Sequence, residues 1–207
     1  SYLLNLNFNK EEKAQLETKF QEFCPVQFEV KNSGFFSSVE TPWNDGLDKL
    51  KEIIMNPKTK IVSFDIFDTL ITRPFLYPKD LFVFLNDDYR KLSNNLGIDF
   101  SKIREDCEVL ARIEAEKEKR EDVTLDRIYE IIKEEYDISS STIEFLKRKE
   151  IELELKFCKR RETAYSIYKL AKYLGKRVIC TSDMYLPLEV IQNILQKNGY
   201  EDIDKIY

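Results

Sequence analysis

Residues 61–74 read IVSFDIFDTLITRP, and this stretch decides the fold class. Residues 60–66 form a short apolar run that predicts a buried strand with Asp65 at its C-terminal end. Open α/β folds bind ligands at the carboxyl ends of their strands. A carboxylate there can attack phosphorus or carbon and form a covalent ester, while following backbone N–H groups hold an anionic oxygen. The alternative is a strand-capping aspartate without chemistry.

A second apolar run, residues 177–181, follows after roughly a hundred residues of mostly helical pattern, whereas a crossover between parallel strands needs only about a dozen. The surplus predicts a helical cap over residues 78–159, inserted into a core made of residues 45–77 and 160–207. The predicted fold class is therefore α/β, with a Rossmann-like parallel sheet and an inserted helical cap. We expect the two strands to be adjacent and parallel.

The helical segments carry several expectations. Pro78 suits the first turn of a helix that runs to residue 93. A helix over residues 101–119 would place apolar side chains on one side, namely Ile103, Cys107, Leu110 and Ile113. Ser141 and Glu144 predict a capping box at the start of a helix over residues 142–158.

Glu150 and Glu154 fall on the inward arc of that last helix, where a carboxylate is costly unless it is paired. Three interpretations stay open. Each could be an edge residue that reaches water, a cap acid that faces the cleft and substrate, or the partner of an arginine such as Arg73.

Composition excludes several function classes. The 207 residues contain no histidine, which excludes imidazole catalysis and histidine-bound zinc. Acids outnumber bases, 38 to 33, which disfavours nucleic acid as a partner. No apolar run approaches the ~20 residues of a membrane span. The cysteines form no CxxC pair, so a reduced, cytoplasmic chain is expected; they are Cys24, Cys107, Cys158 and Cys180.

The segment FDIFDTL, residues 64–70, resembles the first motif of the haloacid dehalogenase superfamily. The segment KRVICTSDMYLP, residues 176–187, resembles the second motif. The resemblance covers about residues 58–207. FDIFDTLITRP together with SDMYLP further resembles a subgroup found beside, or fused to, bacterial glycosyltransferases for surface polysaccharides.

The resemblance implies an aspartyl-nucleophile phosphohydrolase acting on a small phosphorylated substrate. Asp65 would be the nucleophile, Ser182 the phosphate-binding hydroxyl (Thr181 is the alternative) and Asp68 a further catalytic candidate. Mg²⁺ would be the cofactor, held by the Asp65 carboxylate and the Phe67 carbonyl. Phe67 and Thr69 would also line the substrate site.

Three further residues are substrate-binding candidates. Arg73 lies eight residues after Asp65 and could grip phosphate or carboxylate, or it could be a surface arginine before a proline. Asp183 could line the cleft or cap the helix that starts at Pro187. Glu150 is the third candidate, in its cleft-facing interpretation.

Two departures from the superfamily pattern affect these expectations. Its phosphatases carry a second aspartate two residues after the nucleophile, where this chain has Phe67, an aromatic residue as in dehalogenase members. Its third-motif lysine and fourth-motif acids are expected beyond Tyr207. The chain is thus expected to be weak or inactive as a catalyst, and a non-catalytic accessory domain of a glycosyltransferase-associated protein is the alternative.

Residues 1–34 predict a small β-α-β piece, with strands over residues 2–8 and 26–30 around a helix over residues 10–22. The piece faintly resembles an early unit of family-eight-type glycosyltransferases, although it contains no Asp-x-Asp motif. An arbitrary β-α-β piece is the other interpretation. A glycosyltransferase domain in the parent protein is therefore a candidate partner.

Overall fold

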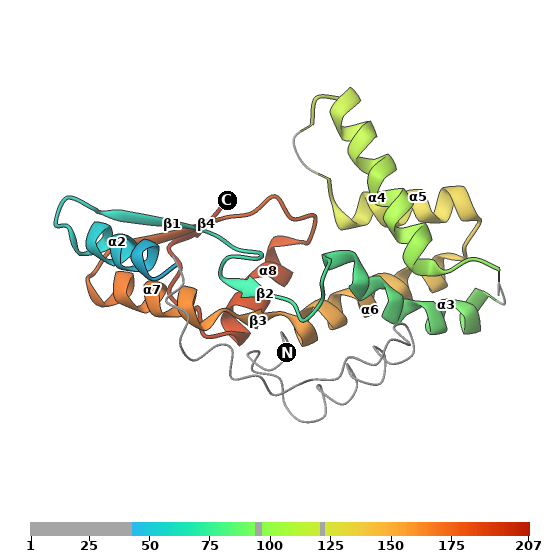
Figure 1. Cartoon of the computed structure of the whole chain (residues 1–207). Coiled ribbons are helices and arrows are strands. Elements are labelled where there is room, and N and C mark those ends of the chain that lie inside the picture. Colours follow the sequence, from blue (N-terminus) through green and yellow to red (C-terminus); the bar gives the residue numbers. More distant parts are fainter. Residues whose placement is uncertain (1–42, 94–96, 121–122) are drawn as a thin grey trace, which may run out of the picture. The chain divides into compact units, whose positions relative to one another are not determined.

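The structure is a computed structural model that describes residues 43–93, 97–120 and 123–207 (Figure 1). The predicted β-α-β piece of residues 1–34 lies outside the described residues. The chain divides into two compact units. The first unit contains the described residues up to Pro74 together with Lys159–Thr181 and Asp202–Tyr207, and the second contains Phe75–Cys158 and Ser182–Glu201.

The first unit is built on a parallel sheet of three strands in the order β1-β4-β5. Its strands are β1 (Ile61–Asp65), β4 (Arg177–Thr181) and β5 (Lys205–Ile206). β1 and β4 pair in parallel from Ile61↔Arg177 to Asp65↔Thr181. The expected adjacency and direction of the two main strands are confirmed, and so is the α/β class with a small parallel sheet.

One face of this sheet is packed and carries the unit's apolar core. Phe64, Val178 and Cys180 are buried. α7 (Glu162–Tyr173) contacts β4, and α2 (Trp43–Met55) contacts α7, so both helices lie below the strands in Figure 1. Because side chains alternate along a strand, Asp65 belongs to the opposite face, with Ile61 and Ser63. All three are exposed.

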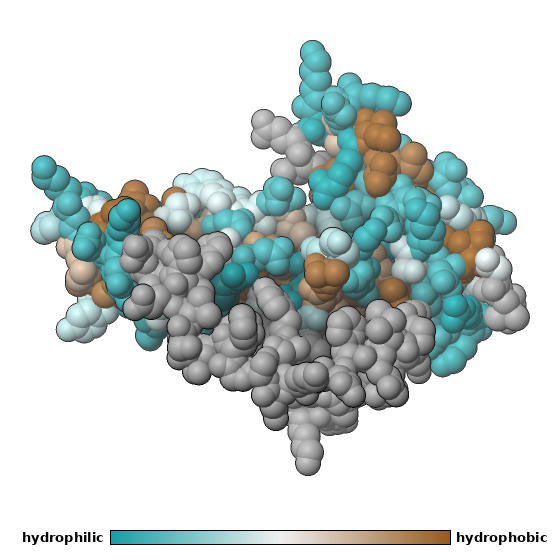
Figure 2. Space-filling view, in the orientation of Figure 1, coloured by the Kyte–Doolittle hydropathy of each residue, from teal (hydrophilic) through white to brown (hydrophobic). Residues whose placement is uncertain are grey.

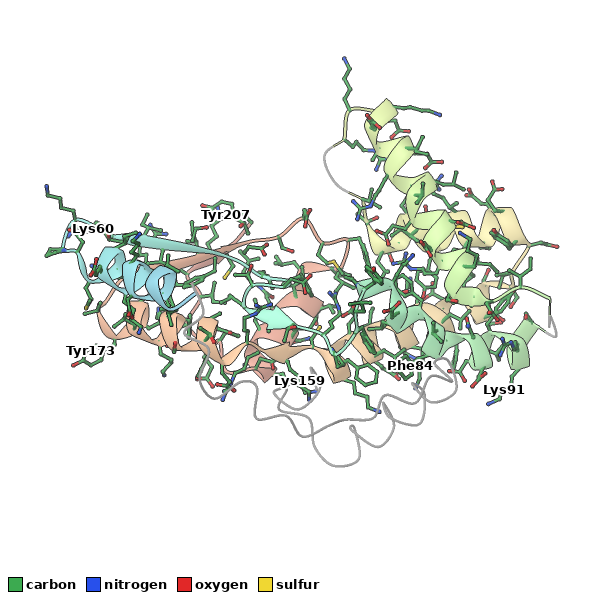
Figure 3. The ribbon with its side chains drawn as sticks, in the orientation of Figure 1. Lys60, Phe84, Lys91, Lys159, Tyr173 and Tyr207 are labelled. Atoms are coloured by element: carbon green, nitrogen blue, oxygen red, sulfur yellow. The ribbon has the colours of Figure 1, made fainter. Side chains whose placement is uncertain are left out.

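Two further strands pair in the first unit beside the end of β1. β2 (Ile71–Thr72) pairs antiparallel with β3 (Lys159–Arg160), whose Lys159 is labelled in Figure 3. The sequence analysis did not predict this pairing. Each strand has only two residues, too few for an alternating pattern to be recognised.

The second unit is helical. Its elements are η2 (Pro78–Leu85), α3 (Asn86–Ser93), α4 (Phe100–Lys117), α5 (Leu125–Tyr136), α6 (Ser140–Phe157) and α8 (Leu188–Lys197). The predicted helix over residues 78–93 thus begins as a 3₁₀ helix. Phe84, labelled in Figure 3, packs against Phe75 and Phe157 with ring centroids 5.8 and 5.1 Å apart.

The buried face of α4 differs from the expected one. Ile103 and Cys107 are fully buried, but Leu110 and Ile113 are 42% and 41% exposed. The buried face continues through Ala111 and Ala115, which follow Cys107 at intervals of four residues. Figure 2 shows an apolar patch over α4, to which its exposed apolar side chains contribute.

The start of α6 also differs from the prediction. The N-cap residue is Ser139 and not Ser141, and its side chain accepts a hydrogen bond from the N–H of Thr142 at 3.2 Å. Three consecutive serines offer the same cap chemistry, so the local pattern could not select one. Among the described residues, no helix has the length and apolarity that a membrane crossing needs.

Candidate functional site

Asp65 is the last residue of β1 and lies opposite Thr181, the last residue of β4. Both residues are exposed at the carboxyl ends of parallel strands. The strand is anchored by buried Phe64, and the next residue, Ile66, is fully buried. The carboxylate is therefore held at the sheet edge by apolar side chains on both sides of it in sequence.

A tight turn follows Asp65. The carbonyl oxygen of Ile66 accepts hydrogen bonds from the N–H groups of Leu70 and Ile71, both at 2.9 Å. Within the turn, Asp68 has φ 58°, in the left-handed region that few L-residues occupy. Aspartate tolerates this region better than most residues because its short polar side chain can bond locally.

Thr69 connects the turn to the candidate nucleophile. Its Oγ1 donates a hydrogen bond to Oδ2 of Asp65 at 2.8 Å. A hydroxyl has a single proton to donate. The Thr69 proton is therefore directed at Asp65, and the bond orients the carboxylate.

Phe67 and Arg73 meet beside this turn. The guanidinium carbon of Arg73 lies 4.7 Å from the centroid of the Phe67 ring, within the range of a cation–π contact. Arg73 is only 5% exposed, so it is not the surface arginine of the alternative interpretation. The structure thus gathers five of the predicted site residues in the first unit: Asp65, Phe67, Asp68, Thr69 and Arg73.

Ser182 and Asp183 belong to the second unit, although Ser182 directly follows Thr181 in the chain. The Ser182 hydroxyl accepts a hydrogen bond from the N–H of Met184 at 3.2 Å. It lines a cavity of about 320 Å³ with residues 123–126 and 184–188. Asp183 is exposed, and the N-cap residue of α8 is Pro187, so the expected cap of this helix is not Asp183.

Glu150 lies in a buried polar cluster of the second unit. Its carboxylate accepts hydrogen bonds from Nε and Nη2 of Arg104, at 2.9 and 2.8 Å, and from the Tyr129 hydroxyl at 2.7 Å. Neither Glu150 nor Arg104 is exposed. Of the three interpretations for Glu150, pairing with an arginine is the one observed, and the arginine is Arg104. Glu154, also buried, accepts a bond from the Cys158 thiol at 3.2 Å.

Arg104 itself is enclosed by aromatic rings. Its guanidinium carbon lies 4.4 Å from the Phe82 ring centroid and 4.7 Å from that of Tyr185. Burial is the largest single influence and would lower the pKa of Arg104. The charge and hydrogen bond of Glu150, together with Tyr185 and Tyr129, outweigh it, so the pKa is raised. The sequence analysis missed Arg104. The available signal was its position next to Ile103, within the buried face of its helix.

Cys180 is an alternative nucleophile by residue type, and it lies in β4 opposite Phe64 of β1. It is fully buried. Burial, with a smaller contribution from the Asp65 charge, raises the pKa of its thiol to about 12. The thiolate is the nucleophilic form of cysteine, so the thiol of Cys180 is inert near neutral pH.

The predicted magnesium ligands are sparse. No group of three or more Asp, Glu, Cys or His side chains is placed to hold a metal ion within the described ranges. Mg²⁺ commonly keeps several waters and takes one or two carboxylates together with substrate phosphate. Of that set, the exposed Asp65 carboxylate lies at the sheet edge, and the Phe67 carbonyl stays a predicted ligand.

Arg161 is a second residue that the sequence analysis missed. Its Nη2 donates to the carbonyl oxygen of Asp68 at 2.8 Å, and its N–H donates to that of Leu70 at 2.9 Å. Arg161 and Asp68 are 93 positions apart in the sequence, and the acceptor is the backbone carbonyl of Asp68. No local sequence pattern signals such a contact.

A comparison of the chain with models of protein families found no match, and a comparison with curated proteins found none either. Any functional assignment rests on the residues and geometry described above.

Proposed function

We propose that this chain carries a haloacid dehalogenase-like phosphohydrolase domain, in which Asp65 is the nucleophile and the substrate is a small phosphorylated metabolite. The observation that carries the proposal is the hydrogen bond from Thr69 Oγ1 to Asp65 Oδ2 at 2.8 Å, at the carboxyl end of β1. This bond orients an exposed carboxylate at the edge where parallel sheets bind ligands.

The proposed reaction has two steps. A carboxylate oxygen of Asp65 attacks phosphorus, the bond between phosphorus and the ester oxygen breaks, and the leaving group takes a proton, for which Asp68 is the candidate donor. Water then attacks the phosphorus of the aspartyl phosphate and gives a proton back to Asp68, while the bond between phosphorus and the Asp65 oxygen breaks and releases phosphate and the Asp65 carboxylate. Ser182 is the proposed hydroxyl donor to the phosphoryl group, because it follows the residue that pairs with Asp65.

Bound Mg²⁺ would neutralise negative charge on the phosphoryl group. The Asp65 carboxylate and the Phe67 carbonyl are its proposed ligands. The buried Arg73 contacts the Phe67 ring and would help to hold it in place. Phe67 offers no proton, so acid catalysis would depend on Asp68 and we expect slow turnover.

The second candidate is a non-catalytic accessory domain in a cytoplasmic, glycosyltransferase-associated protein. One observation favours it. The position where a phosphatase would carry its general acid holds Phe67, engaged with Arg73, and the described chain gathers no acidic metal cluster. Such a domain could keep the sheet edge and its turn without turnover.

Trapping the covalent intermediate distinguishes the two candidates. The protein is incubated with an aryl phosphate and Mg²⁺, quenched with hydroxylamine to convert an aspartyl phosphate into a hydroxamate, and digested with trypsin. We expect the modification on Asp65, in the peptide of residues 61–79, and its loss in Asp65→Asn. Asp48→Asn, an exposed change on α2, should retain it. Wild-type protein that forms no adduct would support the accessory domain.

A further inference from the structure

Arg161 joins the turn after Asp65 to the start of α7. It is the N-cap residue of that helix, and its carbonyl oxygen accepts the N–H of Tyr165 at 2.9 Å. Its own N–H donates to the Leu70 carbonyl, which extends the β2–β3 pairing by one residue. The backbone of Arg161 is thus fixed on two sides.

The side chain of Arg161 reaches the most strained residue of the turn. Its Nη2 donates at 2.8 Å to the carbonyl oxygen of Asp68, the residue with φ 58°. Residues held in this region persist only where the surrounding structure fixes them. A hydrogen bond from a charged donor to the Asp68 carbonyl fixes the orientation of the Asp68–Thr69 peptide.

The orientation of the Asp68–Thr69 peptide sets the position of the Thr69 Cα and Cβ atoms. The Thr69 hydroxyl in turn donates to Oδ2 of Asp65 at 2.8 Å. Two hydrogen bonds therefore link Arg161, through the Asp68 carbonyl and Thr69, to the Asp65 carboxylate. All four residues belong to the first unit.

We propose that Arg161 is a positioning residue for the nucleophile. It holds the Asp68–Thr69 peptide so that Thr69 orients the Asp65 carboxylate for attack. This inference rests on the proposed function for its catalytic part, whereas the structural part can be measured without any activity.

Arg160 provides a matched control. It is the preceding residue and has the same charge, but its Nε donates to Glu162 at 2.8 Å and its guanidinium carbon lies 4.3 Å from the Tyr165 ring. Arg160→Ala and Arg161→Ala remove the same charge at nearly the same place. Arg161→Lys keeps the charge and loses the geometry of the guanidinium group.

The first measurement is hydrogen exchange at the amides of Leu70 and Ile71, which both donate to the Ile66 carbonyl. Arg161→Ala should accelerate their exchange, Arg161→Lys should do so less, and Arg160→Ala should leave it unchanged. Thermal unfolding identifies any variant that is globally destabilised. Unchanged exchange in folded Arg161→Ala would overturn the proposal.

The second measurement is the rate of aspartyl adduct formation with the aryl phosphate as its concentration is varied. We expect Arg161→Ala to lower the maximal rate by roughly tenfold to a hundredfold, as misplaced catalytic groups do, with an unchanged half-saturating concentration. A change in half-saturation alone would indicate direct substrate binding and would overturn the positioning role. If wild-type protein forms no adduct but the exchange result holds, the proposed function fails and Arg161 still fixes the turn.

Discussion

Arg104 and Glu150 form the most deeply buried charged contact among the described residues. Their two hydrogen bonds, at 2.9 and 2.8 Å, join α4 to α6 without exposure of either side chain. Removing water from two charges is expensive, and their attraction offsets the expense only with good geometry and further hydrogen bonds. The Tyr129 hydroxyl and Glu108 supply such bonds.

Removal of one partner should be far more harmful than removal of both. Arg104→Met leaves an unpaired buried carboxylate and should lower the free energy of unfolding by about 3–5 kcal/mol. The double variant Arg104→Met/Glu150→Leu should recover most of that loss. Urea denaturation monitored by circular dichroism measures both.

Arg112→Met serves as the control for the loss of an arginine. Arg112 is 53% exposed and pairs with Glu108, so its loss should change stability by less than about 0.5 kcal/mol. Equal destabilisation by the single and double variants would contradict the interpretation of Glu150 as a structural partner of Arg104.

At the scale of elements, the helix boundaries depend on caps that the structure identifies individually. Ser139 accepts the N–H of Thr142 at 3.2 Å and donates to the Thr142 hydroxyl at 3.0 Å. Ser139→Ala should therefore lower the free energy of unfolding by about 1 kcal/mol. Ser141→Ala should have a smaller effect, because Ser141 contacts the Ser139 hydroxyl at 3.0 Å, whereas Ser139 itself accepts the backbone N–H.

Chemical denaturation of both serine variants and of Ser139→Asp distinguishes the two caps. Aspartate is also a good N-cap residue, so Ser139→Asp should keep most of the stability. A larger loss in Ser141→Ala than in Ser139→Ala would show that α6 begins two residues later, as the sequence alone had suggested.

Elements with local signals could be predicted from the sequence. β4 has the predicted bounds, residues 177–181, and η2 begins at Pro78, as predicted from the proline. The β2–β3 pairing could not be predicted, because it joins two-residue strands far apart in the chain. The buried face of α4 was predicted only in part, because an arginine occupies one of its positions.

The candidate site follows the same division. The place of Asp65 could be predicted, because a strand pattern and the parallel-sheet rule together locate its carboxylate. The contact of Arg161 with the Asp68 carbonyl could not, because side-chain pattern carries no information about a backbone acceptor. An arginine partner was one of three interpretations for Glu150, with Arg73 as the example, and the sequence did not point to Arg104.

At the scale of the whole molecule, the buried thiol of Cys180 should make the free energy of unfolding fall as the pH rises above 9. The pKa of Cys180 rises from an ordinary 9.0 to about 12 on folding, mainly through burial. Below pH 9 the thiol is protonated in both states. Between pH 9 and 12 only the unfolded chain loses the proton, so the free energy of unfolding should fall by up to about 1.4 kcal/mol per pH unit.

Urea denaturation at several pH values tests this expectation. Cys180→Ala should flatten the decline between pH 9 and 12, although it also removes packing at every pH. Burial likewise raises the pKa of Tyr129 and Tyr185, so part of the decline should persist in the variant. An identical pH slope in wild type and Cys180→Ala would show that the thiol is not protected by burial.

The Arg104–Glu150 contact also has an evolutionary consequence. The two positions are 46 residues apart, yet a mutation at either one alone is expected to give a destabilised protein. We therefore expect the two residues to be replaced together, or one at a time only after other mutations have made the protein stable enough to tolerate the single mutant. The two positions, though distant in the gene, should thus change together in related sequences.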